Sequence, residues 1–149
     1  MNQLEMELGL ENYERTNAVS LVNEAFRLYR EYKLVVPREF LPQVTTNYEV
    51  VEYKRGASSH NNYEESLFKY LEYNESIQKK RKYIEKLFKA INQLDAESKL
   101  IIIELYIKNN SNVFIAEKLA VEDTWYYAKK KTAIINFAYI INNWGLLPV

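Results

Sequence analysis

The spacing of hydrophobic positions predicts a chain built mostly from helices. Between residues 11 and 36, apolar side chains recur three and four positions apart, which is the period of an amphipathic helix. Pro37 ends this pattern, because its ring disfavours helix in the residue before it. Residues 43–62 begin with an extended character and finish in the loop-like stretch GASSHNN. The predicted apolar stripe consists of Val19, Val22, Phe26 and Tyr29, widened by Leu21, Ala25, Leu28 and Tyr32.

A second helical pattern covers residues 62–94. Such a helix is long for a globular domain, so it either breaks near Asn74 or extends from the core as a partner-binding element. Asp95 follows as an expected N-cap, and we expect the isoleucines at 101–103 to be helical because helix signals flank them. The apolar positions of the long helix are Leu67, Leu71, Ile77, Ile84, Leu87, Phe88, Ile91 and Leu94.

Two more helices are expected at 112–120 and from about 123 to 142, after a break at NNSN. Gly145 is a natural C-terminal stop, and the apolar tail after it should fold back onto the domain. The sequence therefore predicts an all-α fold. Residues 1–61 are expected to form an N-terminal helix with an extended, flexible linker, and residues 62–149 a second, helical domain.

The last two helices have the spacing of a helix-turn-helix at 112–142. Two helices that cross through a tight turn require a small residue at the crossing and another in the turn. Ala116 and Ala120 stand at these positions, and Tyr126 is the expected inward residue of the second helix. The residues expected to supply the buried contacts around them are Ile115, Leu119 and Val121.

At 100° per residue, Thr124, Ala128 and Lys131 fall opposite Tyr126, with Tyr127 at the edge of that face. A recognition helix places short polar side chains near base edges and cations near phosphates. We expect Asp123, Thr124 and Tyr127 to contribute specificity, and Lys130, on the core side, to extend its amine to water. The other residues predicted to contact DNA are Ala128, Lys118, Lys129, Lys131 and Asn112.

The distribution of charge along the chain supports the DNA-binding interpretation, although the net charge is 0. Residues 1–78 hold 8 Lys/Arg and 13 Asp/Glu, whereas residues 79–149 hold 12 and 7. A basic run, Lys79, Lys80, Arg81 and Lys82, should add affinity, although a solvated helix face explains it equally well. Acidic Glu122 and Asp123 stabilise a helix start but repel phosphate.

The composition gives little support for a catalytic function. The chain has no cysteine and a single histidine, His60, in a loop-like segment. It shows no metal-ligand cluster, phosphate loop or Ser/His/Asp set, so we expect neither an enzyme nor a cofactor. The lack of cysteine fits a reducing cytoplasm, which is the expected location. The N-terminus does not have the form of a secretory signal, and no stretch is apolar enough to span a bilayer.

Several segments together resemble a known family. RLYREYKLVVPREFLPQVTTNYEV at 27–50, LFKAINQLDAESKLIIIELYI, and FIAEKLAVEDTWYYAKKKTAIINFA at 114–138 are similar to the phage ArpU-type (autolysin regulatory protein) transcriptional regulators. The resemblance implies a C-terminal four-helix unit like the promoter-recognition domain of sigma factors, control of phage late genes at promoters, and host RNA polymerase as a partner. In that family Ser and another polar residue commonly stand at positions 122 and 123, and a basic residue at 128; here they are Glu122, Asp123 and Ala128.

The sequence leaves three functions open. The first is a sequence-specific transcription regulator that binds double-stranded promoter DNA, with a homodimer formed through the N-terminal or the long middle helix. The second is a small terminase-like DNA-recognition subunit, which would assemble as a ring. The third is a helical interaction protein in which the helix-turn-helix spacing marks a plain helical hairpin and the lysines are solvated.

Overall fold

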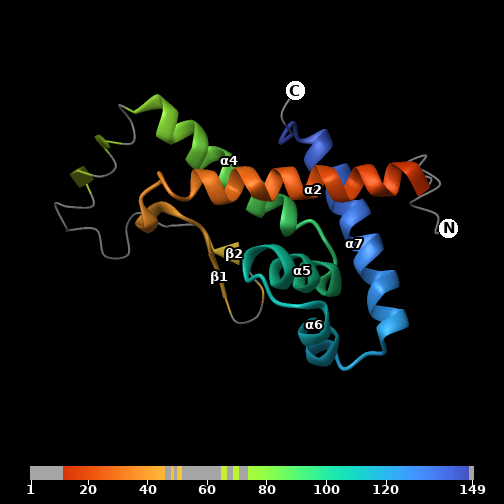
Figure 1. Cartoon of the computed structure of the whole chain (residues 1–149). Coiled ribbons are helices and arrows are strands. Elements are labelled where there is room, and N and C mark those ends of the chain that lie inside the picture. The colour runs from red at the N-terminus through yellow and green to blue at the C-terminus, as the bar shows by residue number, and fades with distance from the viewer. Residues whose placement is uncertain are drawn as a thin grey trace.

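The computed structural model describes residues 12–45, 48, 50–51, 65–66, 69–70 and 74–147. Apart from one short hairpin, every regular element in this part of the chain is a helix, so the all-α prediction is confirmed. In Figure 1, α2 (Asn12–Tyr32) runs across the front of the molecule and α7 (Asp123–Asn143) crosses behind it. Helices α5 (Ala96–Ile102) and α6 (Asn112–Leu119) lie below α2.

Helix α2 confirms the first predicted helix but ends earlier than expected, at Tyr32. The segment up to Pro37 forms a turn in which the Val36 N–H donates to the Tyr32 carbonyl. Val19 is a correction to the predicted stripe, because 41% of it is exposed. The neighbours of α2 cover the opposite side of the helix, and the residues buried there are Ala18, Val22, Ala25, Phe26 and Tyr29.

A short antiparallel hairpin follows the 3-10 turn η1 (Arg38–Phe40). Its strands are β1 (Gln43–Val44) and β2 (Val50–Val51), with Gln43 opposite Val51 and Val44 opposite Val50. The extended character predicted after residue 43 is therefore confirmed, whereas the predicted GASSHNN loop lies outside the described residues.

The continuous helix predicted over 62–94 is wrong, and the alternative of a break near Asn74 is confirmed. Helix α4 is Glu75–Ile91, and Asn74 before it has an extended backbone with φ −105° and ψ 92°. The Asn74 side chain accepts from the Ile77 N–H at 3.1 Å, so this residue caps a new helix instead of continuing an old one. The predicted apolar positions Leu67 and Leu71 lie outside the described residues.

Asp95 is the N-cap of α5, as predicted, and accepts from the Ser98 N–H at 3.3 Å. The three isoleucines are helical and fully buried, but only the first two lie in the α-helix. From Ile103 to Ile107 the backbone widens into a π-helical turn, η2, closed by the Lys108 N–H donating to the Ile103 carbonyl.

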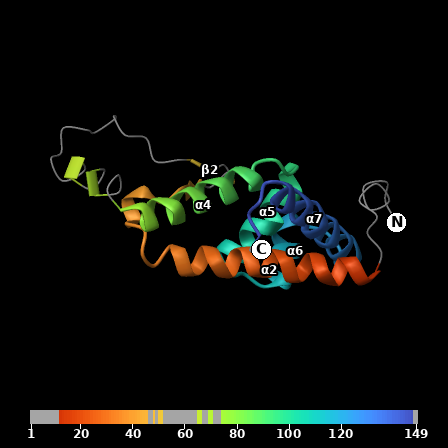
Figure 2. The same cartoon turned by 90° about the horizontal axis from the view of Figure 1, so that it is seen from above.

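Helices α2, α4 and α7 share the main hydrophobic core. Seen from above, the chain runs through α2 and α4 in opposite directions (Figure 2), and α7 packs against both helices. The Phe26 ring of α2 stacks on Phe137 of α7 with 5.7 Å between centroids. The C-terminal tail also folds back as predicted, since Leu146 is buried and Trp144 and Leu147 pack against the core.

Candidate nucleic-acid interface

The turn between α6 and α7 is a tight helix stop that uses alanine where glycine is common. Ala120 has φ 55° and ψ 46°, the left-handed conformation. Its N–H donates to the Glu117 carbonyl at 3.0 Å, and the Val121 N–H donates to the Ala116 carbonyl at 3.2 Å. These two bonds satisfy the last carbonyls of α6 and turn the chain toward α7. The predicted small residue in the turn, Ala120, is thereby confirmed.

Tyr126 anchors the start of α7 on its inner side. Its side chain is fully buried, as predicted, in a small cluster with Ile101, Ile115 and Ala116. Leu119 and Val121 are only partly buried but pack against the same cluster. Burial raises the pKa of Tyr126 to about 12, so the hydroxyl keeps its proton.

The Tyr126 hydroxyl donates to Asn112 Oδ1 at 2.7 Å, and Lys130 Nζ donates to the same oxygen at 3.1 Å. Asn112, which the sequence assigned to DNA, therefore ties the first residue of α6 to the first and second turns of α7. Lys130 lies toward the core side, as expected, and burial lowers its pKa. In this arrangement Asn112 acts as a positioning residue of the helix pair.

The opposite side of α7 faces solvent. Thr124, Tyr127, Ala128 and Lys131 are all exposed, and we call these four residues the outer ridge. Positions 124, 128 and 131 are four and three apart, so they share one side of the helix. Asp123 lies exposed at the helix start, next to the ridge. The predicted orientation of this face is confirmed.

Two of the predicted phosphate-binding lysines are already engaged within the molecule. Lys129 Nζ lies 2.9 Å from Asp95 Oδ2, which joins α7 to the start of α5. Although burial opposes it, hydrogen bonds from Ser98 and Lys129 lower the pKa of Asp95, so this carboxylate stays charged. Lys118 Nζ lies 3.2 Å from Glu104 Oε1. Among the described residues, Lys131 is left as the lysine of the 129–131 run that has neither an ion pair nor a hydrogen bond to a side chain.

Glu104 is the centre of a polar cluster that the sequence did not reveal. Its carboxylate is fully buried and accepts from the Tyr48 hydroxyl, Asn110 Nδ2 and Lys118 Nζ. Lys108 Nζ lies 3.4 Å away. Burial opposes the charge, but these hydrogen bonds and the charge of Lys108 lower the pKa of Glu104 to about 2.

This Glu104 cluster joins three segments. Tyr48 belongs to the hairpin, Glu104 to η2 and Lys118 to α6, and the Lys118 amine also lies 5.2 Å from the Tyr48 ring centre. The cluster therefore holds the hairpin and α6 against η2. Tyr48 belongs to the LPQVTTNYE segment, but its partner lies 56 positions away, so no local signal pairs them.

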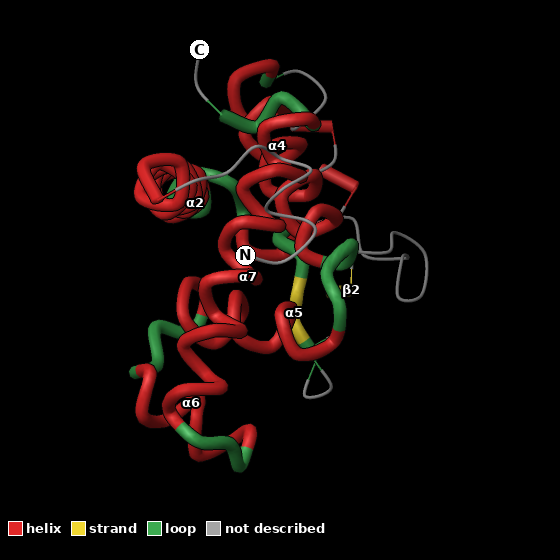
Figure 3. Tube along the Cα trace, turned by 90° about the vertical axis from the view of Figure 1, so that its right-hand side faces the viewer, coloured by secondary structure: helices red, strands yellow, loops and turns green. Residues whose placement is uncertain are grey.

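The basic run at 79–82 does not lie beside the outer ridge. Figures 1 and 3 both place α4 at the end of the molecule opposite α6 and the start of α7. Within the run, Arg81 pairs with Glu85 at 3.0 Å, and Lys80 lies 5.9 Å from the Tyr32 ring centre. The run is therefore a separate feature from the candidate interface.

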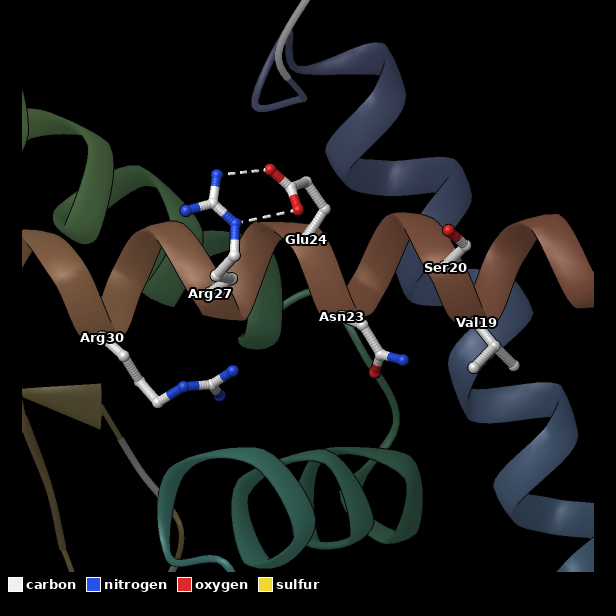
Figure 4. A pocket seen from close by; sticks show the side chains of 6 residues that line it. All are labelled: Val19, Ser20, Asn23, Glu24, Arg27 and Arg30. Carbon is white, nitrogen blue, oxygen red and sulfur yellow. Dashed lines mark hydrogen bonds and ion pairs between the residues drawn. The ribbon is translucent and has the colours of Figure 1, made fainter.

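An open concavity also lies along α2, where Val19, Asn23 and Arg30 point to one side of the helix (Figure 4). Arg27 is paired with both Glu24 and Glu31, so its charge is satisfied within the helix. In the part of the chain that the structure describes, no group of three His, Cys, Asp or Glu side chains could hold a metal ion. No helix in that part is both long and apolar enough to cross a bilayer.

Comparisons of the chain with protein-family models, with curated proteins and with solved structures found no match.

Proposed function

We propose that this protein is a sequence-specific DNA-binding regulator of transcription that inserts the start of α7 into the major groove. The observation that carries the proposal is the exposure of the outer ridge on one side of a helix whose other side is anchored by Tyr126. A recognition helix needs these two properties together, because base edges are read only by side chains that a rigid support holds outward.

Each residue of the ridge has a role that follows from its chemistry. Thr124 can donate to a base or contact a thymine methyl, and Ala128 leaves room for close approach of the helix. We assign Tyr127 and Lys131, which are both exposed, to phosphate oxygens. Asp123 can accept from a cytosine amine, which would make a C·G pair preferred near the helix start.

The ion pairs of Lys118 and Lys129 limit the electrostatic part of the binding. A phosphate that takes Lys129 must compete with Asp95, and a surface ion pair of this kind contributes at most about 1 kcal/mol. Lys129 therefore binds a phosphate only by giving up its ion pair with Asp95, whereas Lys131 has no ion pair to give up. We expect a modest salt dependence, set by few phosphate contacts.

The resemblance to ArpU-type regulators supports the biological context of the proposal. It implies promoters of phage late genes as targets and host RNA polymerase as a partner. A cytoplasmic place of action, expected from the lack of cysteine, belongs to the same proposal. A dimer would bring two copies of the ridge to two half-sites. Mass measurement in solution separates this from the terminase alternative, because a packaging subunit would form a ring of many copies.

The test is a set of binding measurements on DNA fragments from the genome that carries the gene, at several salt concentrations. Lys131→Ala should weaken binding to all sequences and reduce the salt slope by about one. Thr124→Ala should change the preferred sequence instead. Lys86→Ala, an exposed lysine of α4, is the matched control and should leave binding unchanged.

Asp95→Asn sharpens the test, because asparagine keeps the N-cap of α5 but releases Lys129. This variant should bind DNA more tightly and with a steeper salt slope. If the Lys131 and Thr124 variants bind like the unmodified protein, the outer ridge is not the DNA interface. If no salt-sensitive binding occurs at all, the result favours the helical interaction protein over both DNA-binding functions.

A further inference from the structure

Tyr48, which lies between strands β1 and β2, joins the hairpin to the helix-turn-helix. Its backbone has φ 59°, in the left-handed region that a residue with a Cβ adopts only at a cost. The Tyr48 N–H donates to the Thr45 carbonyl at 3.0 Å, so this conformation belongs to a closed turn. A strained backbone of this kind persists only where the surrounding contacts impose it. The side-chain contacts of Tyr48 must therefore offset the cost of its backbone.

The Tyr48 side chain contacts the Glu104 cluster with both its hydroxyl and its ring. The hydroxyl donates to Glu104 Oε1. Burial and this hydrogen bond raise the pKa of Tyr48, so the hydroxyl keeps its proton and remains a donor. The amines of Lys108 and Lys118 lie 5.0 Å and 5.2 Å from the ring centre. Figures 1 and 3 both place the hairpin beside α5, and through Tyr48 it reaches η2 and α6.

Glu104 is also held by contacts from the end of its own helix. The Asn110 N–H donates to the Glu104 carbonyl at 2.8 Å, and the Asn110 side chain donates to Glu104 Oε2. The carboxylate is fully buried, so it cannot lose a donor without a change in its remaining hydrogen bonds. Loss of the Tyr48 hydroxyl is therefore transmitted to the contact between Glu104 and Lys118.

Helix α6 has little apolar burial to fix its orientation. Ile115 and Ala116 are its buried residues, whereas Val113 and Phe114 are 65% and 45% exposed. Apolar burial is also non-directional, so a small apolar contact allows a helix to tilt or rotate at low cost. Hydrogen bonds have preferred distances and angles, and they restrict such movement.

Polar contacts fix α6 near both of its ends. At the start, Asn112 accepts from Tyr126 of α7 at 2.7 Å. Near the other end, Lys118 donates to Glu104 at 3.2 Å. The first contact joins α6 to the helix that carries the outer ridge, and the second joins α6 to η2 and the hairpin. The angle of α6, and with it that of the ridge, therefore depends on both contacts.

We propose that Tyr48 is a positioning residue for DNA reading, because its hydroxyl, through Glu104 and Lys118, holds α6 and the outer ridge at one angle. This role rests on the proposed function of the ridge. The hairpin then works with the helix-turn-helix, although it precedes α4 in the chain. Tyr48 affects which bases the ridge reads and leaves the number of phosphate contacts unchanged.

The first experiment measures hydrogen exchange of the α6 amides by NMR. Tyr48→Phe removes the hydroxyl and keeps the ring, and it should make these amides exchange about tenfold faster, because local opening of α6 costs less free energy. Tyr83→Phe is the matched control. The Tyr83 hydroxyl donates to the Ala25 carbonyl at 3.4 Å and joins α4 to α2 beside the main core. This control should leave α6 exchange unchanged, and unchanged exchange of α4 in Tyr48→Phe shows that the variant is folded.

The second experiment measures the ratio of the affinities for two duplexes at several salt concentrations. One duplex is selected from a random library by the unmodified protein, and the other has the same bases in shuffled order. If one base contact is misaligned, Tyr48→Phe should lower this ratio about tenfold and keep the salt slope. A variant that is only less stable binds both duplexes less in the same proportion, so its ratio does not change. Tyr83→Phe should also keep the ratio.

Unchanged α6 exchange in Tyr48→Phe, or an equal acceleration in Tyr83→Phe, overturns the proposal. A ratio that stays the same while the unmodified protein binds its selected duplex also overturns it, because Tyr48 then contributes to stability alone. Failure of the DNA function gives a different result. In that case the unmodified protein selects no duplex, while faster α6 exchange in Tyr48→Phe still shows that Tyr48 holds α6.

Discussion

The two halves of α7 have different surroundings. Over residues 123–132, Tyr126 is the one buried side chain and the outer ridge faces solvent. From Ala133 onward the buried side chains of α7 belong to the main core; they are Ala133, Ile134, Ile135, Phe137, Ala138 and Ile141. One helix therefore serves as an exposed ridge at its start and as a core element at its end.

This difference also separates two hydrophobic clusters. The main core unites α2, α4 and the second half of α7, whereas the small cluster of Ile101, Ile115, Ala116 and Tyr126 supports the first half. Stability should therefore depend mostly on the second half, and the orientation of the ridge on the first. The polar contacts of Asn112 and Glu104 supplement the small cluster, where apolar burial is limited.

The largest expected effect comes from the core half. Phe137→Ala removes a fully buried ring that stacks on Phe26, and should lower the free energy of unfolding by about 3–5 kcal/mol. Tyr127→Ala, on the exposed half, should change it by less than about 0.5 kcal/mol. Urea denaturation measures both, and similar losses would contradict the division of α7 into two halves.

The second-largest effect tests the polar cluster around Glu104, which contacts α6 through Lys118. The pKa of Glu104 is about 2, below its ordinary value of 4.5. A lowered carboxyl pKa stabilises the fold fully above the ordinary value, and this stability is lost as the pH falls toward the folded value. The contribution is about 3 kcal/mol, from about 1.4 kcal/mol per pKa unit.

Unfolding measured between pH 6 and 2 should therefore show the unmodified protein losing stability below about pH 4.5. Glu104→Gln should start less stable and lose less over that range, because it lacks this titration. If the two proteins lose stability in parallel, Glu104 is not the group responsible.

The smallest effect concerns the turn that sets the angle of the ridge. Ala120 has a positive φ that disfavours any residue with a Cβ, so Ala120→Gly should stabilise the protein by about 0.5–1 kcal/mol. Ala128→Gly, within α7 and exposed, should destabilise it by about 1 kcal/mol. Thermal unfolding distinguishes the two, and changes of the same sign would show that the turn is not strained.

The sequence was most informative where the relevant contacts are local. The cap at Asp95, the turn at Ala120 and the inward position of Tyr126 all follow from residues within a few positions of one another. The sequence was wrong about Val19, since periodicity defines a stripe but not the width that neighbouring helices cover. It was also wrong about a continuous helix over 62–94, because side-chain capping at Asn74 outweighed helix propensity.

The sequence by itself determined the helices, the small residues of the turn and the outward side of α7, because helical geometry fixes which residues share a face. Only the tertiary structure decided which lysines are engaged: Lys129 with Asp95, Lys118 with Glu104 and Lys130 with Asn112. It also decided that the basic side of α4 lies far from the outer ridge. Packing brings together partners that are distant in the chain. The sequence of a lysine run is therefore the same whether its charges are paired with carboxylates or exposed to solvent.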